Sequence, residues 1–180
     1  INEERPQLTK HLATRFKEKI GQNVNLLGEV VLGNGEADHR YHHYLEALES
    51  PDINYISVKI SGIYAQTHAL NYEESFPELV SRMSALYQKA IDFPYTDEDG
   101  IKRSKFINLD MEEYKDAHFT LRLFKAVLNL PQFKNYSAGI VVQAYLPDAY
   151  DFQTELLEFA KARVDGGGAP IKMRLVKGCN

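Results

Sequence analysis

The stretch APIKMRLVKG, residues Ala169–Gly178, alternates apolar and charged side chains, and this alternation decides the fold of the chain. In an extended strand, successive side chains point to opposite faces. One face would then carry Ile171, Met173 and Leu175, and the other Lys172 and Arg174. Charged side chains are rarely buried without a partner. The segment is therefore a half-exposed edge strand, or its charges face groups that need them.

Four other segments alternate in the same way. Their apolar positions are Leu26 and Val30, then Ile56, Val58 and Ile60, then Ile107 and Leu109, and finally Ile140 and Val142. Their polar positions are Asn25 and Glu29, then Ser57, Lys59 and Ser61, then Asn108 and Asp110, and finally Gln143 and Tyr145. One face of each predicted strand is therefore suited to packing against helices, and the other face is not.

Helical periodicity separates these strands. It predicts helices over 8–20, 37–50, 75–90, 117–128 and 152–165. We expect the first to stop at Gly21 and the third to open with a capping box made by Ser75 and Glu78. The polar segment 94–105 is typical of a loop or hairpin. Five strands joined by helices predict a parallel sheet covered by helices.

A doubly wound sheet has helices on both faces, so its strands should be apolar on both. Here only one face is apolar, which favours a (β/α)8 barrel of which the chain supplies the first five strands. Catalytic groups of such barrels lie at the carboxyl ends of the strands. Five polar residues fall toward those ends: Glu29, Lys59, Asp110, Gln143 and Arg174. The alternative is an antiparallel sheet with one solvated face, which the long helical connections disfavour.

We expect two parts, a helical arm over residues 1–21 and the barrel segment over 22–180. The first residue is not Met and the last strand is followed at once by the chain end, which indicates a piece of a longer protein. The net charge of −4 argues against nucleic-acid binding. No apolar run reaches the roughly 20 residues of a membrane span. The single cysteine, Cys179, fits a reducing compartment, and we expect a cytoplasmic protein.

His39 and His43 have the i, i+4 spacing of a metal-binding pair. No HExxH pattern or inward carboxylate accompanies them. We therefore interpret them as part of a solvated helix face, and we expect no metal site.

Four segments, in order, carry a resemblance to a known family: ISVKIS (Ile56–Ser61), NLDMEEY (Asn108–Tyr114), VVQAYLPD (Val141–Asp148) and IKMRLVKG (Ile171–Gly178). The set resembles the proline dehydrogenase domain, most of all that of the bifunctional proline utilization A proteins. The resemblance implies a distorted (β/α)8 barrel that binds FAD and oxidises L-proline to Δ1-pyrroline-5-carboxylate. It also implies a quinone acceptor, with possible peripheral membrane contact, and a C-terminal aldehyde dehydrogenase domain.

The resemblance also implies roles for individual residues. Lys59 matches a lysine that contacts the substrate carboxylate, and an ammonium is a suitable point charge for it. Glu29 matches a glutamate that pairs with an arginine further along the family's chain, as a gate over the substrate. Asp110 matches the active-site aspartate, although the residues alone also allow it to be a helix N-cap.

The positions that match flavin contacts are Met111, Gln143, Arg174, Lys177, Gly178 and Cys179. Arg174 matches the arginine beside the reactive edge of the flavin, where a cation stabilises the anionic reduced form. The family often has alanine and then an aromatic residue where this chain has Cys179 and Asn180. An alternative function is a non-catalytic barrel fragment that serves folding or association.

Overall fold

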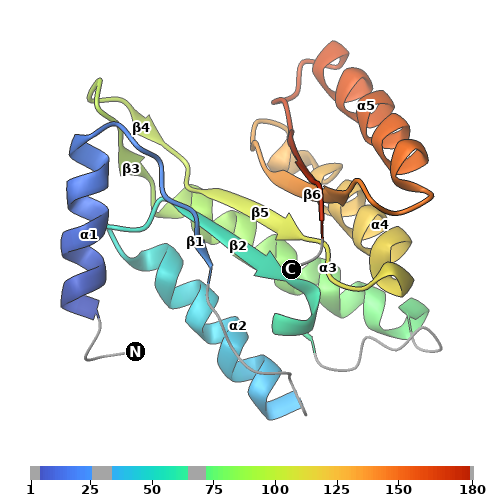
Figure 1. Cartoon of the computed structure of the whole chain (residues 1–180), viewed down its shortest axis with the longest axis horizontal. Coiled ribbons are helices and arrows are strands. Elements are labelled where there is room, and N and C mark those ends of the chain that lie inside the picture. Colours follow the sequence, from blue (N-terminus) through green and yellow to red (C-terminus); the bar gives the residue numbers. More distant parts are fainter. Residues whose placement is uncertain (1–4, 26–33, 65–71, 179–180) are drawn as a thin grey trace.

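The computed structural model describes residues 5–25, 34–64 and 72–178 (Figure 1). Its helices are α1 (Arg5–Lys17), α2 (Asn34–Glu49), α3 (Tyr72–Asp92), α4 (Ala117–Leu128) and α5 (Ala149–Asp165). Its strands are β1 (Val24–Asn25), β2 (Tyr55–Lys59), β3 (Tyr95–Thr96), β4 (Lys102–Arg103), β5 (Phe106–Asp110), β6 (Gly139–Gln143) and β7 (Lys172–Val176). A short 3-10 turn, η1 (Ile60–Gly62), follows β2. None of the helices in the described ranges is long and apolar enough to cross a membrane.

Five strands form one parallel sheet in the order β1-β2-β5-β6-β7. The prediction of a parallel sheet is confirmed, and the antiparallel alternative is wrong. The polar segment 94–105 forms the separate antiparallel hairpin β3–β4, as expected. The sheet of this chain is open, with β1 and β7 at its edges.

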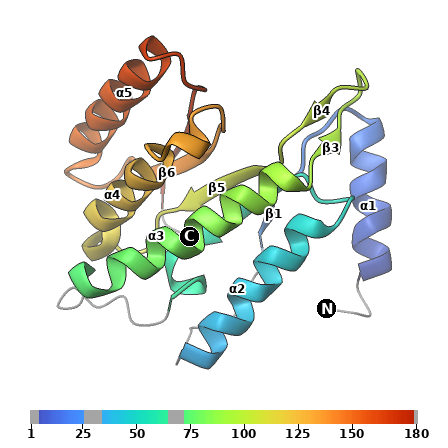
Figure 2. The same ribbon diagram turned by 180° about the vertical axis from the view of Figure 1, so that it is seen from behind.

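Helices α2, α3 and α4 lie over one face of the sheet (Figures 1 and 2). The apolar positions of the central strands point to that face and are fully buried: Ile56, Val58, Ile107, Leu109, Ile140 and Val142. Burying side chains of this size stabilises a fold by roughly 1.5–3 kcal/mol each. Leu175 departs from the expected pattern and is 52% exposed, because β7 is an edge strand.

Several helix ends differ from the prediction, and α1 and α5 each begin three residues earlier than expected, at Arg5 and Ala149. Helix α1 ends at Lys17, before Gly21, because Lys19 adopts the left-handed conformation with φ of 61°. Helix α3 begins at Tyr72, so Ser75 lies inside its first turn and the predicted capping box is wrong. Helix α2 begins at Asn34, three residues before the predicted start. Helix α1 also packs on the main body, since Leu12 belongs to the core.

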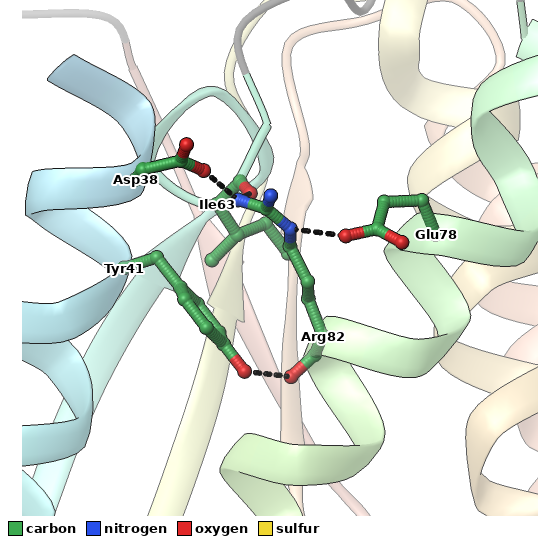
Figure 3. Close-up of polar contacts among 5 residues, drawn as sticks. All are labelled: Asp38, Tyr41, Ile63, Glu78 and Arg82. Atoms are coloured by element: carbon green, nitrogen blue, oxygen red, sulfur yellow. Dashed lines mark hydrogen bonds and ion pairs between the residues drawn. The ribbon is translucent and has the colours of Figure 1, made fainter. Parts of the chain in front are cut away.

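Arg82 joins three elements behind the carboxyl end of β2 (Figure 3). Its guanidinium donates to Glu78 Oε1 at 2.7 Å, to Asp38 Oδ1 at 2.5 Å and to the carbonyl of Ile63 at 2.9 Å. The same guanidinium lies 5.2 Å from the ring centroid of Tyr41. Burial acts to lower the pKa of Arg82, but the hydrogen bonds with Glu78 and Asp38 outweigh it and the pKa is raised. Arg82 therefore ties α2, α3 and the chain leaving η1 together.

Lys105 is buried just before β5, where its ammonium donates to the carbonyl of Ser50 after α2. Burial lowers the pKa of Lys105 to about 8 from its ordinary 10.5, although Asp52 acts in the opposite direction. Between these two values the unfolded chain keeps a proton that the folded chain has lost. By linkage, this lysine makes the free energy of unfolding rise with pH in that window.

We predict that wild type gains stability relative to Lys105→Met as the pH rises from about 8 to 10.5. Urea unfolding at several pH values measures the difference between the two proteins. Lys102→Met, at an exposed lysine of β4, controls for removal of a lysine charge. The prediction would be contradicted if the difference in free energy of unfolding between wild type and Lys105→Met stays constant between about pH 8 and 10.5.

Candidate active site

The face of the sheet opposite the helices carries polar side chains from four neighbouring strands. The parallel register sets Ser57 beside Asn108 and Lys59 beside Asp110. Strand β6 also pairs with β7, and there Val141 is the register partner of Arg174. We call this the inner face. Toward the carboxyl end and the middle of the strands its polar residues are Ser57, Lys59, Asn108, Asp110, Gln143 and Arg174, and Lys172 lies on it at the amino end. The sequence alternation predicted this arrangement.

Arg174 and Asp110 form an ion pair across the inner face. Arg174 Nη2 lies 2.7 Å from Asp110 Oδ1, and their side chains are 37% and 10% exposed. A carboxylate at this depth is costly without a partner, and the guanidinium supplies one. The arginine in the middle of β7 is therefore explained by an aspartate on β5, two strands away.

The Asp110 carboxylate has two further donors that the sequence did not indicate. Asn108 Nδ2 lies 2.8 Å and Ser57 Oγ 3.2 Å from Asp110 Oδ1. Asn23 Nδ2 in turn donates to Ser57 Oγ at 2.8 Å. The alternative role of Asp110 as a helix N-cap is wrong, because α4 begins at Ala117. Asp110 is the centre of a buried polar network.

Lys59 is the last residue of β2 and the register neighbour of Asp110. No described residue forms an ion pair with its ammonium, because Asp110 is paired with Arg174 instead. The side chain is half-buried. Lys59 therefore places a cation at the end of β2, where it is suited to binding the carboxylate of a ligand.

Glu112 ties three strand ends together, and the sequence analysis missed it. Its Oε1 and Oε2 accept from Ser61 Oγ at 2.8 Å and Ser61 N at 3.1 Å. Its backbone carbonyl accepts from Gln143 Nε2 at 3.0 Å. The only signal in the sequence was its place beside Asp110 in the NLDMEEY segment. Glu112 thus fixes η1 after Lys59 and the amide of Gln143 against the end of β5.

Three buried polar atoms of the inner face have no hydrogen-bond partner among the described residues: Asn108 Oδ1, Gln143 Oε1 and Arg174 Nε. The last two are an acceptor and a donor on the neighbouring strands β6 and β7. Buried polar groups are normally satisfied, so such exceptions point to a ligand or water. The edge of an isoalloxazine ring offers both donors and acceptors. The residues present therefore fit the flavin that the sequence resemblance implies.

Other predicted site residues lie elsewhere. Met111 is 9% exposed and belongs to the hydrophobic core, and its predicted flavin contact stays a prediction. Lys177 and Gly178 follow β7 and are exposed. Glu29 and Cys179 lie outside the described residues.

The histidine pair on α2 has no further metal-ligating side chain beside it among the described residues. The rings of His39 and His43 lie 4.1 Å apart between centroids. Among the described residues, no group of three or more metal-ligating side chains comes together.

A cavity of about 450 Å³ lies away from the inner-face network. Leu12, Phe16 and Ile20 line it from the α1 side. Asn54, just before β2, and Tyr95 of β3 line the other side. It is therefore at the amino end of the strands, whereas Lys59, Asp110 and Gln143 are the last residues of theirs. The chemistry-bearing residues are at the carboxyl end, as in barrel enzymes.

The fold and this network define a barrel-type α/β domain with an ion-paired inner face. The family model for proline dehydrogenase matches residues 8–180, and the chain belongs to that family. No curated protein sequence matches the chain.

Solved structures of proline utilization A proteins share the fold. The Corynebacterium freiburgense protein is 42% identical with a TM-score of 0.87, over 97% of this chain and 17% of that one. The Bdellovibrio bacteriovorus protein is 31% identical with a TM-score of 0.77, over 94% of this chain and 18% of that one. The Bradyrhizobium japonicum protein, at 24% identity and a TM-score of 0.71 over 87% of this chain and 16% of that one, shows the fold alone. The chain thus spans less than a fifth of each of these proteins.

We predict that Glu112→Ala lowers the free energy of unfolding by about 1–3 kcal/mol, because it leaves the Ser61 amide without its acceptor. Glu112→Gln keeps one acceptor oxygen and should lose less. Chemical denaturation with a linear extrapolation measures both losses.

Glu113→Ala is the matched control, one residue along the chain. Its carboxylate pairs with Lys115 on the surface, where both side chains are more than half exposed. An exposed pair of this kind contributes little to stability. Equal losses for the two alanine variants would contradict the role given to Glu112.

Proposed function

We propose that the protein carrying this chain oxidises L-proline to Δ1-pyrroline-5-carboxylate with FAD. Membership of the proline dehydrogenase family supports the substrate. The observation that carries the proposal is the Arg174–Asp110 ion pair with two unsatisfied buried atoms, Arg174 Nε and Gln143 Oε1, on the same face. Buried polar atoms on one face of a sheet that lack a partner support a ligand bound there.

The reaction removes a hydride from the ring carbon beside the proline nitrogen and a proton from that nitrogen, so that a C=N bond forms. FAD, when bound, supplies the acceptor for the hydride. Lys59 binds the carboxylate of proline and holds the ring in place, because its ammonium has no ion-pair partner among the described residues. Glu112 keeps that end of β2 in position through Ser61.

Arg174 and Gln143 hold the flavin ring. Gln143 is oriented by Glu112, because its Nε2 donates to the Glu112 carbonyl, while its Oε1 has no partner among the described residues. Arg174 is oriented by Asp110, which accepts from Nη2, while its Nε has no acceptor among the described residues. A fixed cation at this place favours the reduced, anionic ring over the oxidised one.

We also propose that Met111, Lys177, Gly178 and Cys179 belong to the flavin site and Glu29 to the substrate gate, on the sequence resemblance. The same resemblance supports a quinone as electron acceptor, a cytoplasmic protein with peripheral membrane contact, and an aldehyde dehydrogenase domain in the same polypeptide. One solved structure of the same fold is described as that of a bifunctional proline utilization A protein.

Proline-dependent reduction of a dye by the purified full-length protein, yellow with a flavin absorption band, tests the function directly. A flavin-free protein that reduces no dye would favour the non-catalytic alternative.

We predict that Lys59→Met raises the KM for proline while the flavin stays bound. Loss of one charge-assisted hydrogen bond costs about 1.5–3 kcal/mol, or roughly tenfold to a hundredfold in affinity. Steady-state kinetics against proline concentration measures the change. Lys172→Met is the control, because that ammonium lies over the rings of Tyr55 and Phe106 at the amino end of the strands. Unchanged proline kinetics in Lys59→Met would leave Lys59 as a surface lysine of the strand end.

We predict that Arg174→Met shifts the flavin potential to more negative values and slows its reduction by proline, because the cation beside the reduced ring is lost. Arg174→Lys should restore only part of the effect, since an ammonium keeps the charge and loses the planar fork. Spectroelectrochemistry and stopped-flow reduction measure the two quantities. If stability changes while potential and rate do not, Arg174 is only a structural partner of Asp110.

A further inference from the structure

The Asp110 carboxylate is held by three donors that all reach the same oxygen, Oδ1. One is the guanidinium of Arg174, and the other two are the neutral side chains of Asn108 and Ser57. Both neutral donors are fully buried. The orientation of the carboxylate therefore depends on where these two side chains are held.

The Asn108 side chain occupies the space that a side chain at position 139, on the neighbouring strand β6, would otherwise fill. Its register partner on β6 is Gly139. A Cβ added at Gly139 would lie 2.6 Å from Asn108 Oδ1 and 2.9 Å from Phe106 Cε1. Real Cβ atoms do not approach other atoms this closely, so both neighbours would have to shift. The Phe106 ring is half-buried, whereas the Asn108 amide is fully buried and donates to Asp110, so its shift would disturb that hydrogen bond.

The side-chain amide of Asn108 has a hydrogen bond at only one of its two polar atoms among the described residues. Its Oδ1 is buried with no hydrogen-bond partner among the described residues. The hydrogen bond of its Nδ2 to Asp110 is what sets the orientation of the amide. An unsatisfied buried acceptor costs free energy and, in a native structure, requires an explanation. Holding the neighbouring carboxylate supplies that explanation.

Ser57 acts from the opposite side. Its Oγ accepts from Asn23 Nδ2 at 2.8 Å, which leaves its own hydroxyl proton for Asp110 Oδ1 at 3.2 Å. The β1–β2 edge therefore orients the second neutral donor. Asp110 lies between two side chains whose directions are both fixed by neighbouring strands.

We propose that Gly139 and Asn108 are positioning residues for the Asp110 carboxylate: the missing side chain at Gly139 makes the space in which Asn108 orients Asp110, and through it Arg174. This inference rests on the proposed function for its effect on catalysis. Its geometric content, the displacement of Asn108 and Asp110 by a methyl group at position 139, does not.

The test uses four variants of the full-length flavin-loaded protein: Gly139→Ala, Asn108→Ala, the double variant and Gly168→Ala. Gly139→Ala should lower kcat for proline roughly tenfold to a hundredfold, the usual effect of moving a catalytic group by about 1 Å. The KM should change much less, because Lys59 is untouched. Asn108→Ala should lower kcat by a similar factor.

The double variant separates positioning from general damage. Without the Asn108 side chain, the new methyl group has no amide to displace, so the double variant should match Asn108→Ala alone. Gly168→Ala is the control, since its Cβ would crowd Arg163 Cγ and the Arg163 carbonyl, both at 3.0 Å, away from the inner face. It should lower stability and leave kcat unchanged. If Gly139→Ala does not fold, the double variant must fold and match Asn108→Ala.

Losses that multiply in the double variant, or an unchanged kcat in Gly139→Ala, would overturn the inference. A crystal structure of Gly139→Ala reads the positioning without turnover and should show Asn108 and Asp110 displaced. If Asn108 and Asp110 are displaced in Gly139→Ala but the wild-type protein does not oxidise proline, only the proposed function is refuted. Both side chains in place would refute the inference, whatever the activity.

Discussion

Helices cover only one face of the parallel sheet, so the polar side chains of the other face must satisfy one another or a ligand. The ion pair between Arg174 and Asp110 is the main result of this constraint. Ser57 and Asn108 then direct their donors to the same carboxylate oxygen. Because these four residues come from three strands of one sheet, β2, β5 and β7, the register of the sheet and the geometry of the network depend on each other.

The carboxyl ends of the strands are held by contacts outside the regular sheet hydrogen bonds. Glu112 joins the end of β5 to η1 and to Gln143. Arg82 anchors the carbonyl of Ile63, just after η1, to α2 and α3 (Figure 3). Lys59 comes directly before η1, so its backbone is fixed from both sides. Rigid support of this kind is what a binding group needs if its placement is to be accurate.

The two ends of the strands have different physical characters. At the amino end, Lys172 lies 5.2 Å from the ring centroid of Tyr55 and 5.7 Å from that of Phe106. Lys105 is buried there with a lowered pKa, and helix α1 packs nearby. These contacts stabilise the fold. Toward the carboxyl end lie Lys59, whose ammonium has no ion-pair partner among the described residues, and the unsatisfied Oε1 of Gln143, as expected of barrel enzymes, whose catalytic groups lie at this end.

The sequence by itself determined the parallel sheet, the side of each strand that faces the helices, and the inward direction of Arg174, because side chains alternate with a period of two. It did not determine where α1 ends, since Lys19 adopts a conformation more typical of glycine. Only the tertiary structure decided that Asp110 pairs with Arg174 and not with its register neighbour Lys59. It also placed Gly139 against Asn108. Such choices depend on strand order and register, which bring together residues 64 positions apart.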